Sequence, residues 1–161
     1  MKLYIKQKFF SPVHDRFKVY DENQVVIYEA KDKFFSIRNT TTLYNLQGQV
    51  VLELKRKFFS FVNTYFLNIA GKEEVSISRR FFSLRPRFYF TGLDVQVEGK
   101  ILAHDYEIIL DKKVIARIHK KWLAWSDTYE IDIQDERYEI LVIGIVLGID
   151  CVLEDQSKNN D

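Results

Sequence analysis

Four copies of one short element, a basic residue followed by Phe-Phe-Ser, divide this chain into units of similar length. The copies begin at Lys8, Lys33, Lys57 and Arg80, so they recur every 23 to 25 residues. A degenerate fifth copy, Lys121-Trp122-Leu123-Ala124-Trp125-Ser126, keeps the order basic, aromatic, aromatic, hydroxyl. A repeat of this period indicates one supersecondary unit that is used several times. The chain is therefore expected to build its fold from equivalent elements packed on one another.

Each unit has the pattern of a β-hairpin. In the second unit, residues 40–45 and 50–57 are rich in β-forming side chains and flank a turn that contains Gly48. Period-two alternation places Leu52 and Leu54 on one face of the second run and charged residues on the other. Such hairpins must close into a barrel or stack as two sheets, because open edges promote aggregation. We expect a closed antiparallel β-barrel of about 12 strands.

The character of the sequence changes after Asp135. Residues 136–153 are apolar around nearly the whole helical circumference, as is typical of a helix buried on every side. Asp135 has the side chain of a good N-cap. The strands are the only wall available to cover this helix, so the helix is expected to thread the barrel. Residues 1–154 then form one domain, and 155–161 form a polar tail.

Three residues inside this helix are assigned structural roles. Gly144 and Gly148 permit close approach of another backbone, which inside a barrel means tight packing against a strand. Asp150 carries a charge that is costly to bury without a partner. A hydrogen bond that fixes the helix in the barrel is therefore favoured for Asp150 over a metal or ligand role.

The composition excludes several classes of protein. A net charge of +1 argues against a strongly basic nucleic-acid binder, and a single cysteine, Cys151, cannot form an internal disulfide. The longest apolar run, residues 140–149, is half of the roughly 20 residues that a membrane-spanning helix needs. The N-terminus lacks the apolar stretch of a signal peptide. We expect a cytoplasmic protein that has no transmembrane segment and binds no nucleic acid.

The sequence contains little that indicates catalytic chemistry. The three histidines occur singly and without metal-ligand spacing, and no enzyme motif is found. Residues 94–105 imitate a calcium-binding loop, but their flanks read as strands, and a hairpin turn at Glu98-Gly99 is the favoured alternative. The expectation is a protein that is not an enzyme and needs neither a cofactor nor a metal ion.

Repeated hairpins, followed by Asp135-Glu136-Arg137 and one apolar C-terminal helix, resemble the LURP-one-related (YxjI-like) family, which has the tubby C-terminal-like fold. The resemblance covers nearly the whole chain and implies a barrel around a central helix. Phospholipid scramblases are more distantly similar, through Ile143-Gly144, Ile149-Asp150 and Glu154. This chain lacks their proline-rich extension, cysteine cluster and nuclear import segment. Tubby domains bind phosphoinositides through basic residues, which implies an anionic lipid or a phosphate as the ligand class.

Basic residues at equivalent repeat positions, and others that support them, are the candidate ligand contacts. Equivalent positions in a barrel can collect at one rim, where concentrated positive potential attracts phosphate groups. The alternative is a solvated face that prevents strand edges from pairing. The candidates are Lys33, Lys55, Lys57, Arg80, Arg117 and Lys121.

The sequence thus favours a non-catalytic domain that binds an anionic phospholipid or a phosphorylated small molecule, in the cytoplasm and peripherally at the membrane. Two alternatives stay open. A protein-interaction scaffold requires an exposed apolar patch. A scramblase-like transfer of phospholipid requires calcium and membrane insertion.

Overall fold

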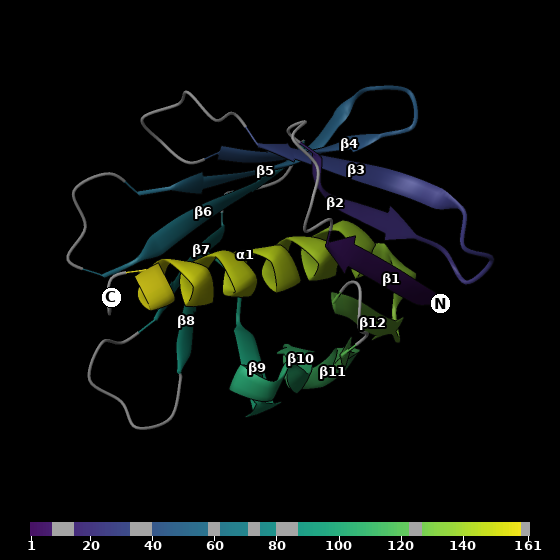
Figure 1. The fold of residues 1–161 in the computed structure, drawn as a ribbon. Coiled ribbons are helices and arrows are strands. Elements are labelled where there is room, and N and C mark those ends of the chain that lie inside the picture. The colour runs from purple at the N-terminus through teal and green to yellow at the C-terminus, as the bar shows by residue number, and fades with distance from the viewer. Residues whose placement is uncertain are drawn as a thin grey trace.

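The computed structural model of this chain describes residues 1–7, 15–32, 40–57, 62–70, 75–79, 87–122 and 127–158. These residues form twelve strands, two short 3-10 helices and one α-helix (Figure 1). The elements, in chain order, are β1 (Lys2–Gln7), β2 (Asp15–Tyr20), β3 (Val26–Asp32), β4 (Thr40–Asn45), β5 (Val50–Arg56), β6 (Thr64–Ile69), β7 (Val75–Arg79), β8 (Phe88–Thr91), β9 (Val95–Lys100), η1 (Ile101–Ala103), β10 (Asp105–Leu110), β11 (Lys113–Trp122), β12 (Asp127–Ile133), η2 (Glu136–Tyr138) and α1 (Glu139–Lys158).

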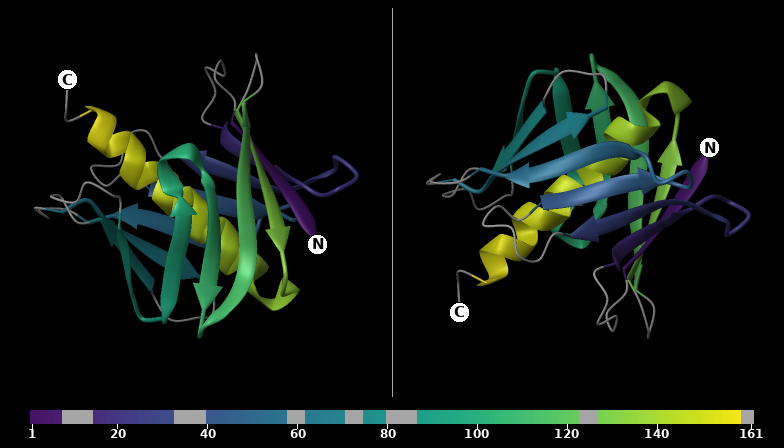
Figure 2. Two further views of the ribbon diagram at one scale, coloured as in Figure 1. Left: turned by 90° about the horizontal axis from the view of Figure 1, so that it is seen from below. Right: turned by 90° about the horizontal axis from the view of Figure 1, so that it is seen from above.

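All twelve strands belong to one antiparallel sheet, in the order β8-β7-β6-β5-β4-β3-β2-β1-β12-β11-β10-β9. The pairing of β1 with β12 joins the two ends of the chain's β region, so the sheet curls nearly into a barrel (Figures 1 and 2). β8 and β9 stand at the two ends of the order, and within the described residues no pairing joins them. The twelve-stranded barrel expected from the sequence is confirmed, with a seam between these two strands.

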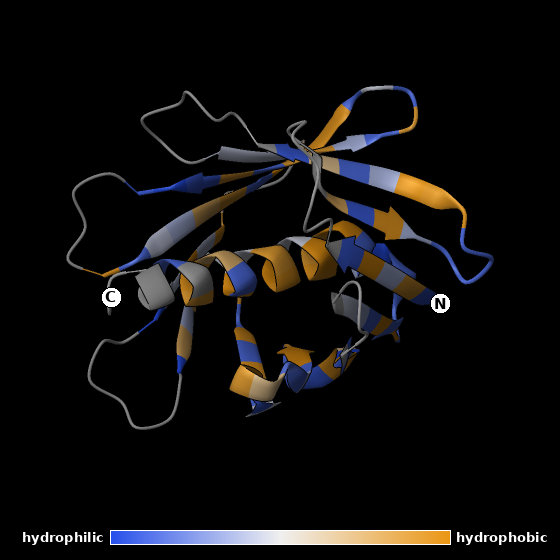
Figure 3. Cartoon of the chain, in the orientation of Figure 1, coloured by the Kyte–Doolittle hydropathy of each residue, from blue (hydrophilic) through white to orange (hydrophobic). Residues whose placement is uncertain are grey.

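The helix α1 runs through the interior of the curled sheet (Figure 2). Every residue from Leu141 to Val152 is buried, and the hydropathy colouring shows the centre of the helix as mainly hydrophobic (Figure 3). Because strand side chains pack around this apolar helix, the inner face of the sheet and the surface of the helix are both removed from water. In the described part of the chain, no helix combines the length and apolarity needed to cross a lipid bilayer.

The ends of the helix differ from the predicted range of 136–153. Its first three predicted residues form the 3-10 turn η2, where the Asp135 carboxylate accepts a hydrogen bond of 3.2 Å from the backbone N–H of Arg137. At its other end α1 continues to Lys158, so the first residues of the expected polar tail are helical. The polar residue Asp155 is buried there and hydrogen-bonded, which explains why a polar sequence remains helical.

Two glycines bring the helix against β5, β6 and β7. A Cβ atom at Gly144 would lie 2.5 Å from Leu67 Cδ1, and one at Gly148 would overlap Ile77 Cδ1. Both distances are shorter than side-chain contacts allow, so any larger residue at these positions needs movement of the opposing wall. The helix backbone therefore approaches these three strands more closely than it approaches the other described strands.

The hairpin turn expected at Glu98-Gly99 is wrong. β9 continues through both residues to Lys100, and the reversal is made by η1 and the following His104, whose backbone φ is +50°. Gly99 lies opposite Tyr106 with φ +127°, a backbone conformation that L side chains rarely adopt. The glycine is thus needed inside a strand. The segment that imitates a calcium-binding loop, residues 94–105, contains this strand.

Candidate functional site

The antiparallel order sends alternate connections to the same end of the barrel. We call one end the repeat end, because its connections, residues 8–14, 33–39, 57–63, 80–87, 101–104 and 123–126, include all four copies of the repeated element. The last turns of α1 also reach this end, where Asp155 contacts Arg56 and Tyr65. We call the opposite end the turn end; its connections are residues 21–25, 46–49, 70–74, 92–94, 111–112 and 134–138.

The sequence gives the two ends opposite charge. The connections of the repeat end contain no Asp or Glu and seven basic residues, which are Lys8, Lys33, Arg38, Lys57, Arg80, Arg85 and Arg87. Those of the turn end contain three basic residues, Lys72, Lys112 and Arg137, and eight acidic ones, Asp21, Glu22, Glu73, Glu74, Asp94, Asp111, Asp135 and Glu136. By sequence, the connecting segments of the repeat end are therefore basic and those of the turn end mainly acidic, although the net charge is near zero. Carboxylates at the adjoining strand and helix ends, such as Asp105 and Asp155 at the repeat end, are outside this count.

Of the six candidate ligand contacts, Lys57 and Lys121 lie at the repeat end. Lys57 directly follows β5 and is exposed, and its backbone N–H donates a hydrogen bond of 2.7 Å to the carbonyl of Thr64. Lys121 is exposed near the end of β11, where its Nζ lies 2.5 Å from Glu130 Oε2. Lys33 and Arg80 lie outside the described residues, each next in sequence to a strand that ends there, at Asp32 or Arg79.

Lys55 and Arg117 project from the outer faces of their strands and pair with acidic neighbours. Lys55 Nζ lies 2.7 Å from Glu53 Oε2, and Arg117 Nε lies 2.7 Å from Glu107 Oε1. In the sheet order β5 and β11 are separated by β4, β3, β2, β1 and β12. The four candidates within the described residues thus lie in two separate parts of the barrel and do not gather on one wall.

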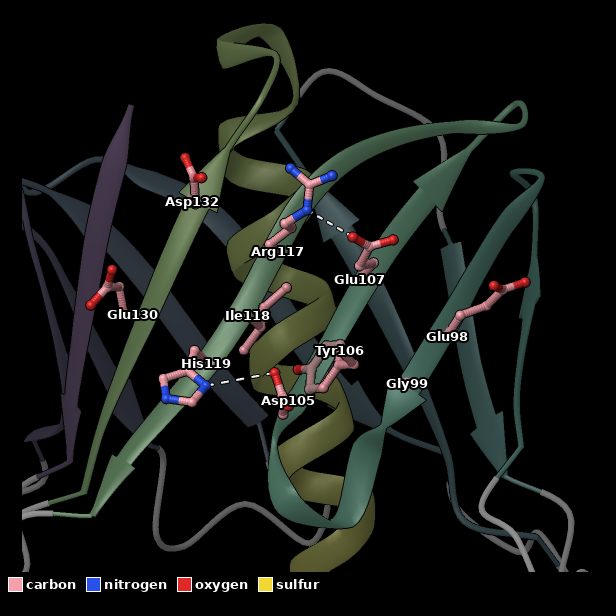
Figure 4. Close-up of a pocket in the computed structure, with 10 residues that line it drawn as sticks. All are labelled: Glu98, Gly99, Asp105, Tyr106, Glu107, Arg117, Ile118, His119, Glu130 and Asp132. Atoms are coloured by element: carbon pink, nitrogen blue, oxygen red, sulfur yellow. Dashed lines mark hydrogen bonds and ion pairs between the residues drawn. The ribbon is translucent and has the colours of Figure 1, made fainter.

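A hollow of about 540 Å³ lies on the outer surface of β9 to β12 (Figure 4). The side chains around it are mainly acidic, and two of them make contacts drawn in the figure: Glu107 pairs with Arg117, and Asp105 Oδ1 lies 3.6 Å from His119 Nδ1. Hydrogen bonds from Lys121 and Lys2 hold the pKa of a further lining residue, Glu130, below its ordinary value. The acidic side chains are Glu98, Asp105, Glu107, Glu130 and Asp132. An excess of carboxylates makes this hollow a poor site for an anion.

A group at the repeat end was not found from the sequence. Arg56 Nε lies 3.2 Å from Asp155 Oδ2, the hydroxyl of Tyr65 donates a hydrogen bond of 2.7 Å to the same oxygen, and Arg56 Nη2 donates one of 3.3 Å to Asn63 Oδ1. The group joins the end of β5, the start of β6 and the end of α1. One signal was available: Arg56 continues the inward-facing positions of Leu52 and Leu54, and a charge there needs a partner.

A second polar group lies inside the barrel. The hydroxyl of Tyr129 on β12 donates a hydrogen bond of 2.6 Å to Asp150 Oδ1 on α1, and both side chains are buried. The carboxylate of Asp150 thus has a hydrogen-bond donor inside the barrel, as expected from the sequence. Among the described residues, no group of three or more His, Cys, Asp and Glu side chains has the arrangement of a metal site.

The described residues thus form a nearly closed antiparallel barrel with one buried C-terminal helix. The sequence matches the LURP-one-related family over residues 1–150, and the chain belongs to this family. It is 26% identical over 160 residues to the uncharacterised protein YxjI of Bacillus subtilis (strain 168), with 98% of each chain covered.

The crystal structure of a protein from Arabidopsis thaliana is similar to this chain, with a TM-score of 0.58, 12% sequence identity, and coverage of 92% of this chain and 91% of that one. At this level of identity the likeness shows a shared fold. The expected family and fold are therefore confirmed.

Proposed function

We propose that the repeat end of the barrel binds an anionic ligand, either the headgroup of a membrane phospholipid or a phosphorylated small molecule, and that the domain acts by binding and not by catalysis. The observation that carries this proposal is the charge separation between the two ends. Each Lys or Arg close to an anionic surface contributes about 1 kcal/mol of attraction. Several basic residues at one end, with acidic residues at the far end, would orient the barrel on such a surface.

The experiment compares two pairs of charge reversals in flotation with vesicles of phosphatidylcholine that contain phosphatidylserine. Lys57→Glu with Arg87→Glu changes two exposed residues of the repeat end, and Lys112→Glu with Lys113→Glu changes two exposed residues beside the turn end. Both variants lose the same total charge. We expect the first to weaken binding by about tenfold per reversed residue and the second to leave binding almost unchanged, because the attraction falls off within a Debye length.

The two sources of the anionic group are separated by competition. If a soluble phosphate is the ligand, free inorganic phosphate at millimolar concentration displaces the protein from the vesicles. If a lipid surface is the ligand, displacement needs salt that screens the whole surface. Equal loss of binding in both charge-reversed variants would contradict the proposal. Absence of binding by the unaltered protein to every vesicle, together with no binding of inorganic phosphate, would also contradict it.

A further inference from the structure

Arg56 lies at the repeat end, follows Lys55 and precedes Lys57 in sequence, and already has an acidic partner. Its side chain is 37% exposed, and its Nε lies 3.2 Å from Asp155 Oδ2. The carboxylate of Asp155 is only 11% exposed. The most basic tripeptide among the described residues thus has its central residue held by an acid of the helix.

Asp155 is held in place from its other side. The buried hydroxyl of Tyr65 donates a hydrogen bond of 2.7 Å to the same oxygen, Oδ2. Burial above all raises the pKa of Tyr65 above its ordinary value, so the phenol keeps its proton and remains a donor. The carboxylate therefore sits between a donor that belongs to the core and a donor that faces the surface.

The chemistry of this contact is that of an anion-binding site. A guanidinium pairs with carboxylate and with phosphate through the same planar donors, and both pairs form strong, charge-assisted hydrogen bonds. Beside Arg56, the Nδ2 donor of Asn63 is buried and has no hydrogen-bond partner within the described part of the chain. The amide of Asn63 thus lies next to the guanidinium, which is hydrogen-bonded to its Oδ1.

We propose that Arg56 is a ligand-binding residue of the repeat end, and that Asp155 is an internal competitor that holds its guanidinium while no anionic ligand is bound. This inference rests on the proposed function. A ligand that takes the guanidinium leaves Asp155 with Tyr65 as its remaining hydrogen-bond donor, so the last turns of α1 are held less firmly. Because linkage is reciprocal, firmer docking of the helix end weakens ligand binding.

The test compares two substitutions that each remove one negative charge from the repeat end. Asp155→Asn weakens the internal competitor, and Asp105→Asn is the matched control, since Asp105 begins β10 at the same end and does not contact Arg56. Affinity is measured with vesicles of phosphatidylcholine and phosphatidylserine. We expect Asp155→Asn to bind at least fivefold more tightly than Asp105→Asn, and Arg56→Gln to remove this difference when combined with each.

A second variant and a second measurement guard against misfolding. Tyr65→Phe keeps the charge and removes one of the two donors to Asp155, so by the same linkage it is expected to bind the vesicles more tightly than the unaltered protein does. Thermal melting shows whether each variant is folded. In the unaltered protein, amide hydrogen exchange at residues 150–158 should become faster when anionic vesicles are added.

The outcomes separate the two proposals. If the unaltered protein binds the vesicles but Asp155→Asn and Asp105→Asn bind equally well, the repeat end is a binding surface and the internal competitor is overturned. Unchanged or slower exchange at residues 150–158 on binding also overturns it. If none of the folded proteins binds, the proposed function and this inference fail together.

Discussion

The two walls of the barrel meet the helix in different ways. The wall made of β5, β6 and β7 is aliphatic where it faces the centre of α1, and Gly144 and Gly148 let the backbone approach it closely. The wall made of β10, β11 and β12 also has buried aliphatic side chains, but it adds Tyr106, Tyr129 and Lys120, which are buried too. We call the first the apolar wall, because its glycine contacts bring the helix backbone close, and the second the polar wall, because Tyr129 hydrogen-bonds to the buried Asp150.

On the polar wall the contacts converge on Tyr129. Its hydroxyl donates to Asp150, its ring meets that of His104 edge-on with centroids 5.2 Å apart, and Lys120 Nζ lies 5.2 Å from its ring centroid. A buried hydrogen bond between one hydroxyl and one carboxylate is directional. We infer that the glycine contacts with the apolar wall set the distance of the helix, and that the hydrogen bond to Asp150 helps to set its rotation.

The largest expected effect comes from breaking the close approach at the apolar wall. Gly148→Leu places a side chain where Ile77 and Leu54 now pack, and overpacking of this kind costs about 3 kcal/mol of unfolding free energy. The neighbouring Ile149→Leu conserves volume on the same helix and should cost less than about 1.5 kcal/mol. Urea denaturation measures both. An equal loss in the two variants would show that the glycine contact does not set the helix position.

The next effect tests the polar wall with two tyrosines. Tyr129→Phe removes the donor to Asp150 and is expected to cost about 2 kcal/mol, as for other hydrogen bonds to charged groups. Tyr106→Phe removes a buried hydroxyl that has no hydrogen-bond partner within the described residues, so stability should stay the same or rise slightly. Thermal and urea unfolding of both variants provide the comparison. A larger loss from Tyr106→Phe would reverse the roles given to these residues.

A smaller, pH-dependent effect is expected at the start of the helix, where Glu139 on α1 meets Tyr28 on β3. Burial raises the pKa of Glu139 above its ordinary value, and burial next to this carboxylate raises the pKa of Tyr28 to about 12. A raised carboxyl pKa means that the folded state binds the proton more tightly than the unfolded state does. The ionised form therefore lowers stability at neutral pH, and this loss disappears as the pH falls through the folded pKa to the unfolded one.

Glu139→Gln should accordingly be more stable than the unaltered protein at pH 7, and the difference should shrink toward zero as the pH approaches 4. Unfolding free energies measured between pH 4 and pH 8 check this. If Glu139→Gln is instead less stable than the unaltered protein at pH 7, and this deficit shrinks toward pH 4, the folded state lowers the pKa of Glu139 and does not raise it.

The smallest effects belong to the outer faces of the two walls, which resemble each other. Lys55→Ala on β5 and Arg117→Ala on β11 each break one exposed ion pair, and each should change stability by less than about 1 kcal/mol. Raising the salt concentration should reduce these changes further. A clear loss from only one of the two would show that the walls also differ on their outer faces.

The fold could be predicted from the sequence because the repeat, the period-two alternation and the buried helix all depend on local pattern. The hairpin of β4 and β5 around Gly48 has the expected bounds to within one residue. The turn predicted at Gly99 was wrong because a glycine indicates a turn when its strand partner is unknown. Its need for φ +127° follows from its pairing with Tyr106, which local pattern does not contain.

The candidate site could be predicted only in part. The repeat identifies basic positions that alternate connections bring to one end, yet it does not reveal which basic residue has an acidic partner. Arg56 and Asp155 are 99 positions apart in the chain and meet because the helix returns through the barrel. Their pairing depends on three-dimensional packing, so no spacing rule along the sequence would have found it.

The position of the helix after all twelve strands has a consequence for how the protein is made. β1 completes its pairing with β12 only after residue 133 has been synthesised, and the helix that fills the interior follows later still. A nascent chain that stops before α1 can pair strands that are neighbours in sequence, but it has the long-range pairing of β1 with β12 to close and no helix to close it around. Closure of the barrel is therefore expected only after α1 has been synthesised, and until then the apolar faces of the strands are open to aggregation.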